Sequence, residues 1–285
     1  MPTVSAIVIV KNEERHLRGC LEGLTWADQV VVLDSFSQDA TVAIAREFTP
    51  HVYQRAFTTL PNQRNAALSY AGGEWIWVMD ADERLSPELR DEILDTVHDP
   101  GDRAGFWVPR YNIILGKVMH HAGWYPDRQL RLFRRQQVIY DERYMGHERM
   151  LVRDGAGGYR AVAREDTGHL KNHYLHYNYE TIGQLARKQN FYADLEARAL
   201  AGFGLRARPQ NFVLQPLREI HRRYVAWEGW KDGGHGLLMS LVMAVYQVAV
   251  YGKLARLNGM EWTVGRRPVA SRQSPVGSGE GRGGG

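Results

Sequence analysis

The chain has 285 residues and a formal net charge of +4, with enough apolar and aromatic residues for a sizeable core. This length allows one large domain or two small ones, and the positive charge favours anionic partners such as phosphates or acidic lipids. The single cysteine, Cys20, excludes an internal disulfide and fits a reducing compartment. The sequence has no zinc-finger spacing, no aromatic RNA-binding motif and no basic-then-apolar start, so we expect neither a nucleic-acid partner nor a signal peptide.

The N-terminal part alternates between strand-like and helix-like segments. Short β-branched or aromatic apolar runs predict strands at residues 4–10, 29–33, 51–55 and 74–79. Apolar residues at helical spacing predict helices at residues 13–24, 41–48 and 62–70. Strands separated by helices predict a parallel sheet with helices on both faces, and ligands bind such sheets outside the carboxyl ends of the strands.

Polar clusters follow three of these predicted strands: Lys11-Asn12-Glu13, Asp34-Ser35-Phe36-Ser37 and Asp80-Ala81-Asp82-Glu83. Residues i and i+2 of an extended segment point the same way, so Asp80 and Asp82 can converge on one divalent cation such as Mg²⁺ or Mn²⁺. The alternative is a strand-to-helix turn, in which Ser86 and Pro87 begin the next helix and the acids favour its N-terminus.

In the second half of the chain the regular alternation of predicted strands and helices ends. Strands are expected at residues 106–111 and 130–133, and a helix at residues 177–200. Residues 233–252 contain no Asp, Glu, Lys or Arg, which suits an interfacial membrane helix, a spanning helix or a buried core helix. The Gly/Ser-rich residues 271–285 are expected to be disordered.

Four ordered motifs carry a resemblance to a known family. They are Ser5 to Glu13, Val31 to Thr41, Gln63 to Leu68 and Met79 to Glu83. In order and spacing they resemble the family 2 glycosyltransferases. The later segments Trp124 to Arg134, His147-Glu148 and Gly229 to Gly233 resemble the subgroup of lipopolysaccharide-core glucosyltransferases.

The resemblance implies an α/β GT-A fold, a Rossmann-like mixed sheet flanked by helices. It would comprise residues 1–176, with a donor part at 1–103 and an acceptor part at 104–176. A helical, membrane-associating extension at residues 177–265 and a disordered tail at 266–285 would follow.

The resemblance also implies donor-side residues. Asn12, Asp34, Arg64 and Asp80 would bind the nucleotide sugar, and Asp82 would be the principal metal ligand with Asp80 beside it. Many relatives carry two adjacent acids where this chain has Asp34-Ser35, so the nucleotide base stays open. The alternatives are a turn-forming Asp34 and an exposed helix arginine at position 64. Glu13 is expected to be a capping residue.

On the acceptor side, the resemblance points to Glu148 as the catalytic base, which takes the proton of the attacking hydroxyl. His147 would orient it or touch the acceptor, while a surface glutamate beside Arg149 is the alternative. Tyr125, Asp127 and Arg128 are further acceptor-side candidates, although a loop that packs Tyr125 into the core would look the same.

Three histidines at positions 169, 173 and 176 suggest zinc, but no cysteine supports a zinc site. The alternation of histidine and tyrosine around them favours instead a strand that lines the acceptor cleft.

The resulting hypothesis is an inverting, metal-dependent transferase that moves a hexose from a nucleotide-diphosphate sugar, UDP-glucose first, to a cell-envelope saccharide such as lipopolysaccharide core. It would act as a peripheral protein on the cytoplasmic face of a bacterial inner membrane. The alternatives are transfer to a polyprenyl phosphate or another glycan, or a non-catalytic sugar-nucleotide-binding scaffold. The Gln-x-x-Arg-Trp signature of processive relatives is absent, which favours a single addition.

Overall fold

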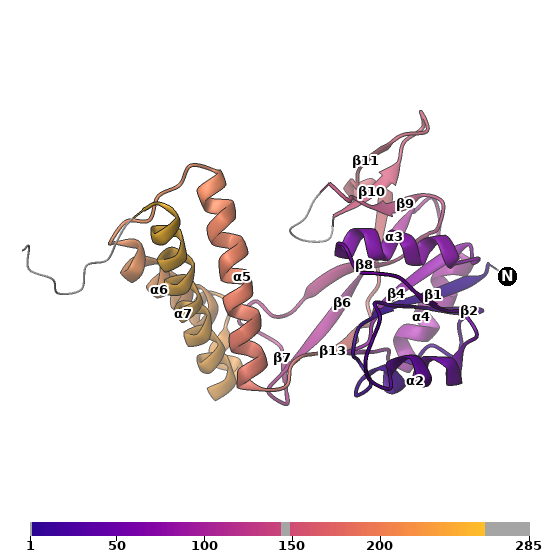
Figure 1. The fold of residues 1–285 in the computed structure, drawn as a ribbon, viewed down its shortest axis with the longest axis horizontal. Coiled ribbons are helices and arrows are strands. Elements are labelled where there is room, and N and C mark those ends of the chain that lie inside the picture. The colour runs from indigo at the N-terminus through magenta and orange to yellow at the C-terminus, as the bar shows by residue number, and fades with distance from the viewer. Residues whose placement is uncertain (1, 144–148, 260–285) are drawn as a thin grey trace, which may run out of the picture.

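The computed structural model describes residues 2–143 and 149–259 and shows an α/β part followed by a helical part (Figure 1). The predicted disordered tail lies outside the described residues. The central sheet is mixed. Its strands are β1 (Val4–Val10), β2 (Gln29–Asp34), β3 (Val52–Gln54), β4 (Trp75–Asp80), β5 (Glu83–Arg84), β6 (Gly105–Ile114), β7 (Lys117–Met119), β8 (Asp127–Arg134), β12 (Thr167–His169) and β13 (Tyr174–Tyr179).

The strand order along the sheet is β3-β2-β1-β4-β8-β6-β13-β5, with β7 and β12 paired to β6. The first four strands are parallel, as the alternation of strands and helices predicts. β8 then runs antiparallel to both β4 and β6, and β13 runs parallel to β6. A small antiparallel sheet of β9 (Val138–Tyr140), β10 (Met150–Arg153) and β11 (Tyr159–Ala161) lies beyond the central sheet (Figure 1).

Helices cover both faces of the sheet because successive residues of its strands point to opposite sides. Val8 of β1 packs with α1 (Leu17–Glu22), α2 (Thr41–Phe48) and α4 (Pro87–His98). Its neighbour Ile7 packs on the other side with α3 (Leu60–Tyr70). The predicted helix start at Ser86 and Pro87 is confirmed, since the Ser86 hydroxyl accepts the backbone N–H of Leu89 at 3.2 Å.

The prediction that a helix begins at Tyr177 is wrong. β13 continues to Tyr179, because its tyrosine and histidine side chains alternate toward the interior while its backbone pairs with β6. The helix α5 (Ile182–Gly202) follows Thr181, whose hydroxyl accepts the N–H of Gln184 at 3.1 Å while the Gln184 side chain caps in return. This Thr-x-x-Gln capping box was the sequence signal for the true boundary.

The helical part contains α5, α6 (Asn211–Ile220) and α7 (Gly234–Leu257), and both α5 and α6 pack against α7. A buried aspartate, Asp232, joins it to the hairpin of β6 and β7. Its carboxylate accepts the backbone N–H of His121 at 2.8 Å, and its carbonyl accepts the Lys117 ammonium at 2.6 Å. The segment Gly229–Asp232 therefore anchors the hairpin to the helices.

α7 is long and apolar enough to cross a membrane, with a mean hydropathy of 1.6 over its most apolar window. Only 33% of that window is buried, and the exposed side chains include Leu241, Val245 and Val248. A core helix of a soluble protein has the same length and composition, so membrane association stays a prediction.

Candidate active site

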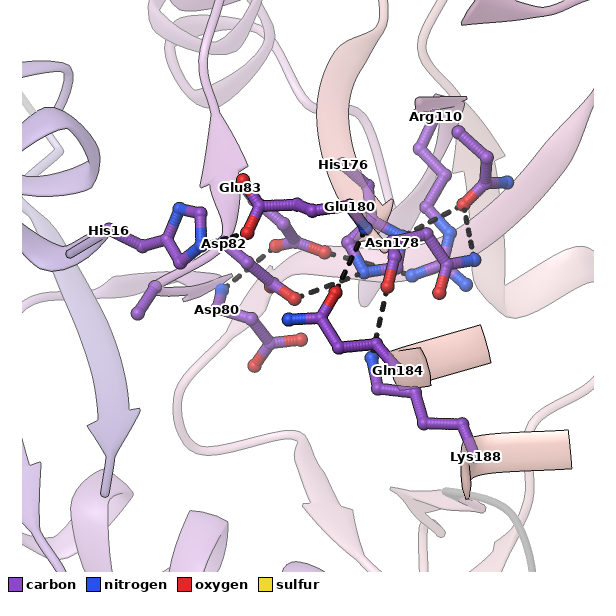
Figure 2. Close-up of polar contacts among 12 residues, drawn as sticks. His16, Asp80, Asp82, Glu83, Arg110, His176, Asn178, Glu180, Gln184 and Lys188 are labelled. Carbon is purple, nitrogen blue, oxygen red and sulfur yellow. Dashed lines mark hydrogen bonds and ion pairs between the residues drawn. The ribbon is translucent and has the colours of Figure 1, made fainter. Parts of the chain in front are cut away.

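A cleft of about 250 Å³ opens where β1 and β4 end, at the carboxyl edge of the parallel strands. Glu13 follows β1 and Asp82 follows β4, and both line it. The opposite wall comes from α5, and Figure 2 shows Asp82 pointing toward the space in front of Gln184 and Lys188. The polar residues expected at these two strand ends therefore meet in one cavity.

Asp80, the last residue of β4, lies between two buried arginines. Its carboxylate accepts Nη2 of Arg64 at 2.8 Å and Nη2 of Arg131 at 2.9 Å. Burial alone would raise the pKa of Asp80, but these two guanidinium groups outweigh it and hold the pKa below its usual range. Arg64 is only 2% exposed, so the alternative of an exposed helix arginine is wrong.

Glu83 completes this ionic network from a fully buried position. Its carboxylate accepts the backbone N–H of Asp80 at 2.8 Å and Nη2 of Arg131 at 2.7 Å. Burial raises the pKa of Glu83, with the ion pair to Arg131 opposing that shift. Two carboxylates and two arginines thus fix the end of β4 and the turn that follows, a role the sequence did not assign to Glu83 or Arg131.

Asp82 has different surroundings from Asp80, because residues 81 and 82 form a turn between β4 and β5. The extended geometry expected for Asp80 and Asp82 is therefore not present. A carboxylate oxygen of Asp82 lies 3.5 Å from Nε2 of His176. Burial alone would raise the pKa of Asp82, but the contact with His176 lowers it, and the Lys188 ammonium acts in the same direction.

The tautomer of His176 follows from its other partner. Nδ2 of Asn112 donates to the carbonyl of Trp124 and to the carboxylate of Asp127, both at 3.1 Å, so Oδ1 faces His176. His176 Nδ1 lies 2.8 Å from this oxygen and must donate to it. Burial lowers the pKa of His176 while the Asp82 carboxylate opposes that shift, so Nε2 faces Asp82 either with a proton, which it donates to the carboxylate, or with a lone pair.

A lone pair facing a carboxylate is unfavourable unless a proton or a cation lies between them. Asp82 and His176 are therefore the residues whose atoms suit a divalent cation in this cleft. The part of the chain that the structure describes holds no group of three or more His, Cys, Asp or Glu arranged for a metal. The remaining ligands would come from water and substrate phosphates, as is usual for Mg²⁺ and its chemical relatives.

Glu13 faces the same cavity. Burial raises the pKa of Glu13 to about 7, and the nearby charge of Asp82 adds to that shift. The sequence predicted only capping for this residue, whereas its side chain contributes to the charge of the cleft.

Comparison with known proteins identifies the family. The sequence model described as "Glycosyl transferase family 2" matches residues 5–170. The chain belongs to glycosyl transferase family 2. The resemblance drawn from the four motifs is confirmed, and the protein is a family 2 glycosyltransferase.

Two curated relatives extend over nearly the whole chain. This glycosyltransferase is 27% identical over 263 residues to the lipopolysaccharide core biosynthesis glycosyltransferase LpsC of Rhizobium meliloti (strain 1021), covering 90% of this chain and 94% of LpsC. It is 28% identical over 264 residues to an uncharacterized glycosyltransferase of Rickettsia felis, covering 90% of each chain.

A solved structure shares the fold. The mannosyltransferase PcManGT from Pyrobaculum calidifontis, in complex with GDP-Man and Mn²⁺, aligns with a TM-score of 0.51 at 14% identity. The alignment covers 89% of this chain and 87% of that enzyme. This likeness concerns the fold alone, and it agrees with the predicted mixed α/β architecture.

In this glycosyltransferase, Asn12 and Asp34 organise the loops beside the cleft. Asn12 has a φ of 56°, its N–H donates to the Ser37 hydroxyl at 2.8 Å, and its side-chain oxygen accepts the N–H of Gln38 at 2.8 Å. The buried Asp34 accepts the N–H of Ser37 at 3.0 Å and Nε2 of Gln54 at 2.9 Å. The turn-forming role of Asp34 is confirmed, and its contact with the donor stays a prediction.

The acceptor-side candidates are only partly described. His147 and Glu148 lie outside the described residues. Tyr125 stacks on Tyr111 with ring centroids 4.5 Å apart, Asp127 accepts Nε of Arg110 at 2.6 Å, and Arg128 is exposed on β8. Asp127 therefore supports the residues that position His176, a function that the sequence pattern did not indicate.

Proposed function

We propose that this family 2 glycosyltransferase is an inverting, metal-dependent enzyme that moves a hexose from a nucleotide-diphosphate sugar to a saccharide of the cell envelope. The observation that carries this proposal is the pairing of Asp82 with His176 at the carboxyl edge of β1 and β4. Ligands of α/β sheets bind at this edge, and a diphosphate needs positive charge there.

The donor side combines a cation site with fixed charges of the chain. Asp82 and His176 would hold a divalent cation, which stabilises the negative charge that develops on a departing diphosphate. Arg64 and Arg131 keep Asp80 ionised and fixed beside that place. Lys188 lines the opposite wall and adds a positive charge from α5. Asn12 and Asp34 would meet the nucleoside, where the loops after β1 and β2 are tied together.

On the acceptor side, inversion needs a base that removes the proton of the attacking hydroxyl. We assign this step to Glu148, with His147 beside it, on the strength of their place in the family pattern. Tyr125, Asp127 and Arg128 are the remaining candidates for contacts to the acceptor.

The proposed acceptor is a lipopolysaccharide-core saccharide, because LpsC carries that function in its name and matches most of this chain. Such an acceptor is lipid-linked, and the donor is cytosolic. We therefore place the protein at the cytoplasmic face of a bacterial inner membrane, with the exposed apolar side chains of α7 facing lipid.

Calorimetric titration with UDP-glucose, with and without Mn²⁺, tests the donor site. Metal-dependent binding is the expected result, and release of UDP on addition of core oligosaccharide would establish transfer. GDP-mannose serves as the comparison donor, since PcManGT holds GDP-Man with Mn²⁺ on the same fold. If the affinity for UDP-glucose or GDP-mannose were the same with Mn²⁺ and with EDTA, metal dependence would be contradicted.

A further inference from the structure

A second cleft, of about 550 Å³, lies in the helical part, away from the strand ends. We call it the α5 groove. Its walls come from α5, α7 and the end of α6 with the following helical segment His221–Ala226. The side chains used below are Gln189, Tyr192, Glu196, Ala199, Tyr246 and Gln247.

The α5 groove continues the wall of the active-site cleft. Gln184 and Lys188 of α5 line the cleft, and Tyr192 and Ala199 line the groove. Residues at helical spacings of three and four share one face, and each such step rises by about 4.5 to 6 Å along the axis. One face of α5 therefore leads from the active site into the groove, and Figure 1 shows α5 running from the end of β13 alongside α7.

The junction between the two clefts is fixed by a hydrogen bond. Nε2 of Gln189, in the groove, donates at 3.0 Å to the hydroxyl of Tyr179, the last residue of β13. Lys188, beside it, donates at 3.2 Å to the carbonyl of Asn178, which lines the active-site cleft. These two hydrogen bonds thus fix the position of the α5 groove relative to β13, the strand that carries His176.

The chemistry of the groove suits a saccharide. Two tyrosine rings, Tyr192 and Tyr246, offer apolar faces, while the Tyr246 hydroxyl donates to Glu196. The amides of Gln189 and Gln247 also line the groove. A hydrocarbon chain would cover these polar groups without bonding them, at a cost in free energy, whereas sugar hydroxyls both donate and accept hydrogen bonds.

We propose that the α5 groove binds the saccharide units of the acceptor that precede the unit receiving the new sugar. This inference rests on the proposed transfer to a saccharide, and it makes α5 the element that selects oligosaccharides over single sugars. Each further unit would lie one step along the same helix face.

The test is binding of deacylated lipopolysaccharide-core oligosaccharides of graded length to the full chain, followed by calorimetry. Affinity should rise with length until the groove is filled. Ala199→Trp, which obstructs the groove, and Tyr192→Ala, which removes a ring, should each weaken the longest oligosaccharide by about 10-fold and flatten the length dependence. Having two variants guards against a folding defect in one of them, which thermal unfolding of each would reveal.

The control is Phe203→Ala, because Phe203 is an aromatic residue at the end of α5 that is 82% exposed and outside the groove. It should bind like the wild type. Affinity that is independent of length, or unaffected by both groove variants, would overturn the proposal. If the two groove variants weakened binding of the acylated acceptor but not of the deacylated oligosaccharide, the groove would bind a hydrocarbon chain. That result would also overturn the proposal. A failure of UDP-glucose and GDP-mannose binding would instead count against the proposed function, because that titration does not involve the groove.

Discussion

Nε2 of His176 lies 3.5 Å from a carboxylate oxygen of Asp82, although β13 and the β4–β5 turn are far apart in the sequence. The pairing of β13 with β5 brings them together, since His176 is the register partner of Glu83. The N–H of Tyr177 also donates to the carbonyl of Asp82 at 2.8 Å. The backbone of the sheet thus positions a histidine against the acidic turn.

We expect both side chains to support metal-dependent donor binding. Asp82→Ala should weaken Mn²⁺-dependent UDP-glucose binding by at least ~100-fold, and His176→Ala by about 10- to 100-fold. Calorimetry with and without EDTA measures both. His169→Ala, at an exposed position of β12, is the matched control and should bind like the wild type. If His176→Ala kept the full metal dependence, His176 would not be a ligand.

The sequence predicted much of this fold because its signals are local. Short patterns of apolar residues predicted the parallel strands β1 to β4, including the buried β4 that ends at Asp80. A short capping pattern predicted the start of α4. The role of His176 depends instead on β5, a strand of two residues whose partner lies far along the chain. No local pattern specifies such a pairing.

The same limit applies to the ionic network. The acidic cluster Asp80-Ala81-Asp82-Glu83 was evident, but the sequence did not show which cationic side chains would neutralise it. In the sequence Arg131 is one of four arginines at positions 128, 131, 134 and 135, and only its inward direction in the sheet makes it the partner of Asp80 and Glu83.

Removal of Arg131 should therefore destabilise the protein far more than removal of its neighbour. Arg131→Met leaves Glu83 buried without its closest cation, and we expect a loss of about 3 kcal/mol in the free energy of unfolding. Arg128→Met, on the exposed part of the same strand, should change it by less than about 0.5 kcal/mol. Urea denaturation compares the two, and equal losses would contradict a structural role for the network.

Glu13 should make stability depend on pH in the metal-free protein. The pKa of Glu13 is raised from 4.5 to about 7 on folding, so the native state binds the proton more tightly than the unfolded state. Its contribution to stability is therefore present below about pH 4.5 and is lost as the pH rises through about 7.

Glu13→Gln stays neutral, so at about pH 8 it should be more stable than the wild type by about 1 kcal/mol, after allowance for solvent screening in the open cleft. At about pH 4 the two proteins should be equally stable. Thermal unfolding in EDTA across this range gives the comparison. A difference that did not vary with pH would show that Glu13 is not the group responsible.

The assignment of Glu148 as the base predicts a separation of binding from turnover. Glu148→Gln keeps the shape of the side chain but cannot accept the proton, so kcat should fall by about 10²- to 10⁴-fold. Metal-dependent UDP-glucose binding should stay at the wild-type level, which calorimetry on the same sample checks. A near-normal kcat would mean that another carboxylate is the base.

Close packing between α7 and the segment Gly229–Asp232 predicts opposite effects for two glycines of one helix. A Cβ at Gly236 would lie 1.8 Å from the carbonyl oxygen of Gly229, a backbone atom that cannot swing aside. Gly236→Ala should therefore cost at least about 3 kcal/mol in the free energy of unfolding. A Cβ at Gly252 would meet nothing within 4 Å, so Gly252→Ala should stabilise α7 by up to about 1 kcal/mol.

The added Cβ in Gly236→Ala would displace the segment Gly229–Asp232. This segment contains Asp232, which holds the hairpin of β6 and β7. In Gly236→Ala the amide of His121 should therefore exchange its hydrogen faster than in the wild type, while in Gly252→Ala its exchange should be unchanged. Mass-spectrometric exchange of the hairpin peptide distinguishes this from a purely local effect on α7. Loss of stability without faster exchange at the hairpin would mean that Asp232 is held by contacts other than the packing of Gly229 on Gly236.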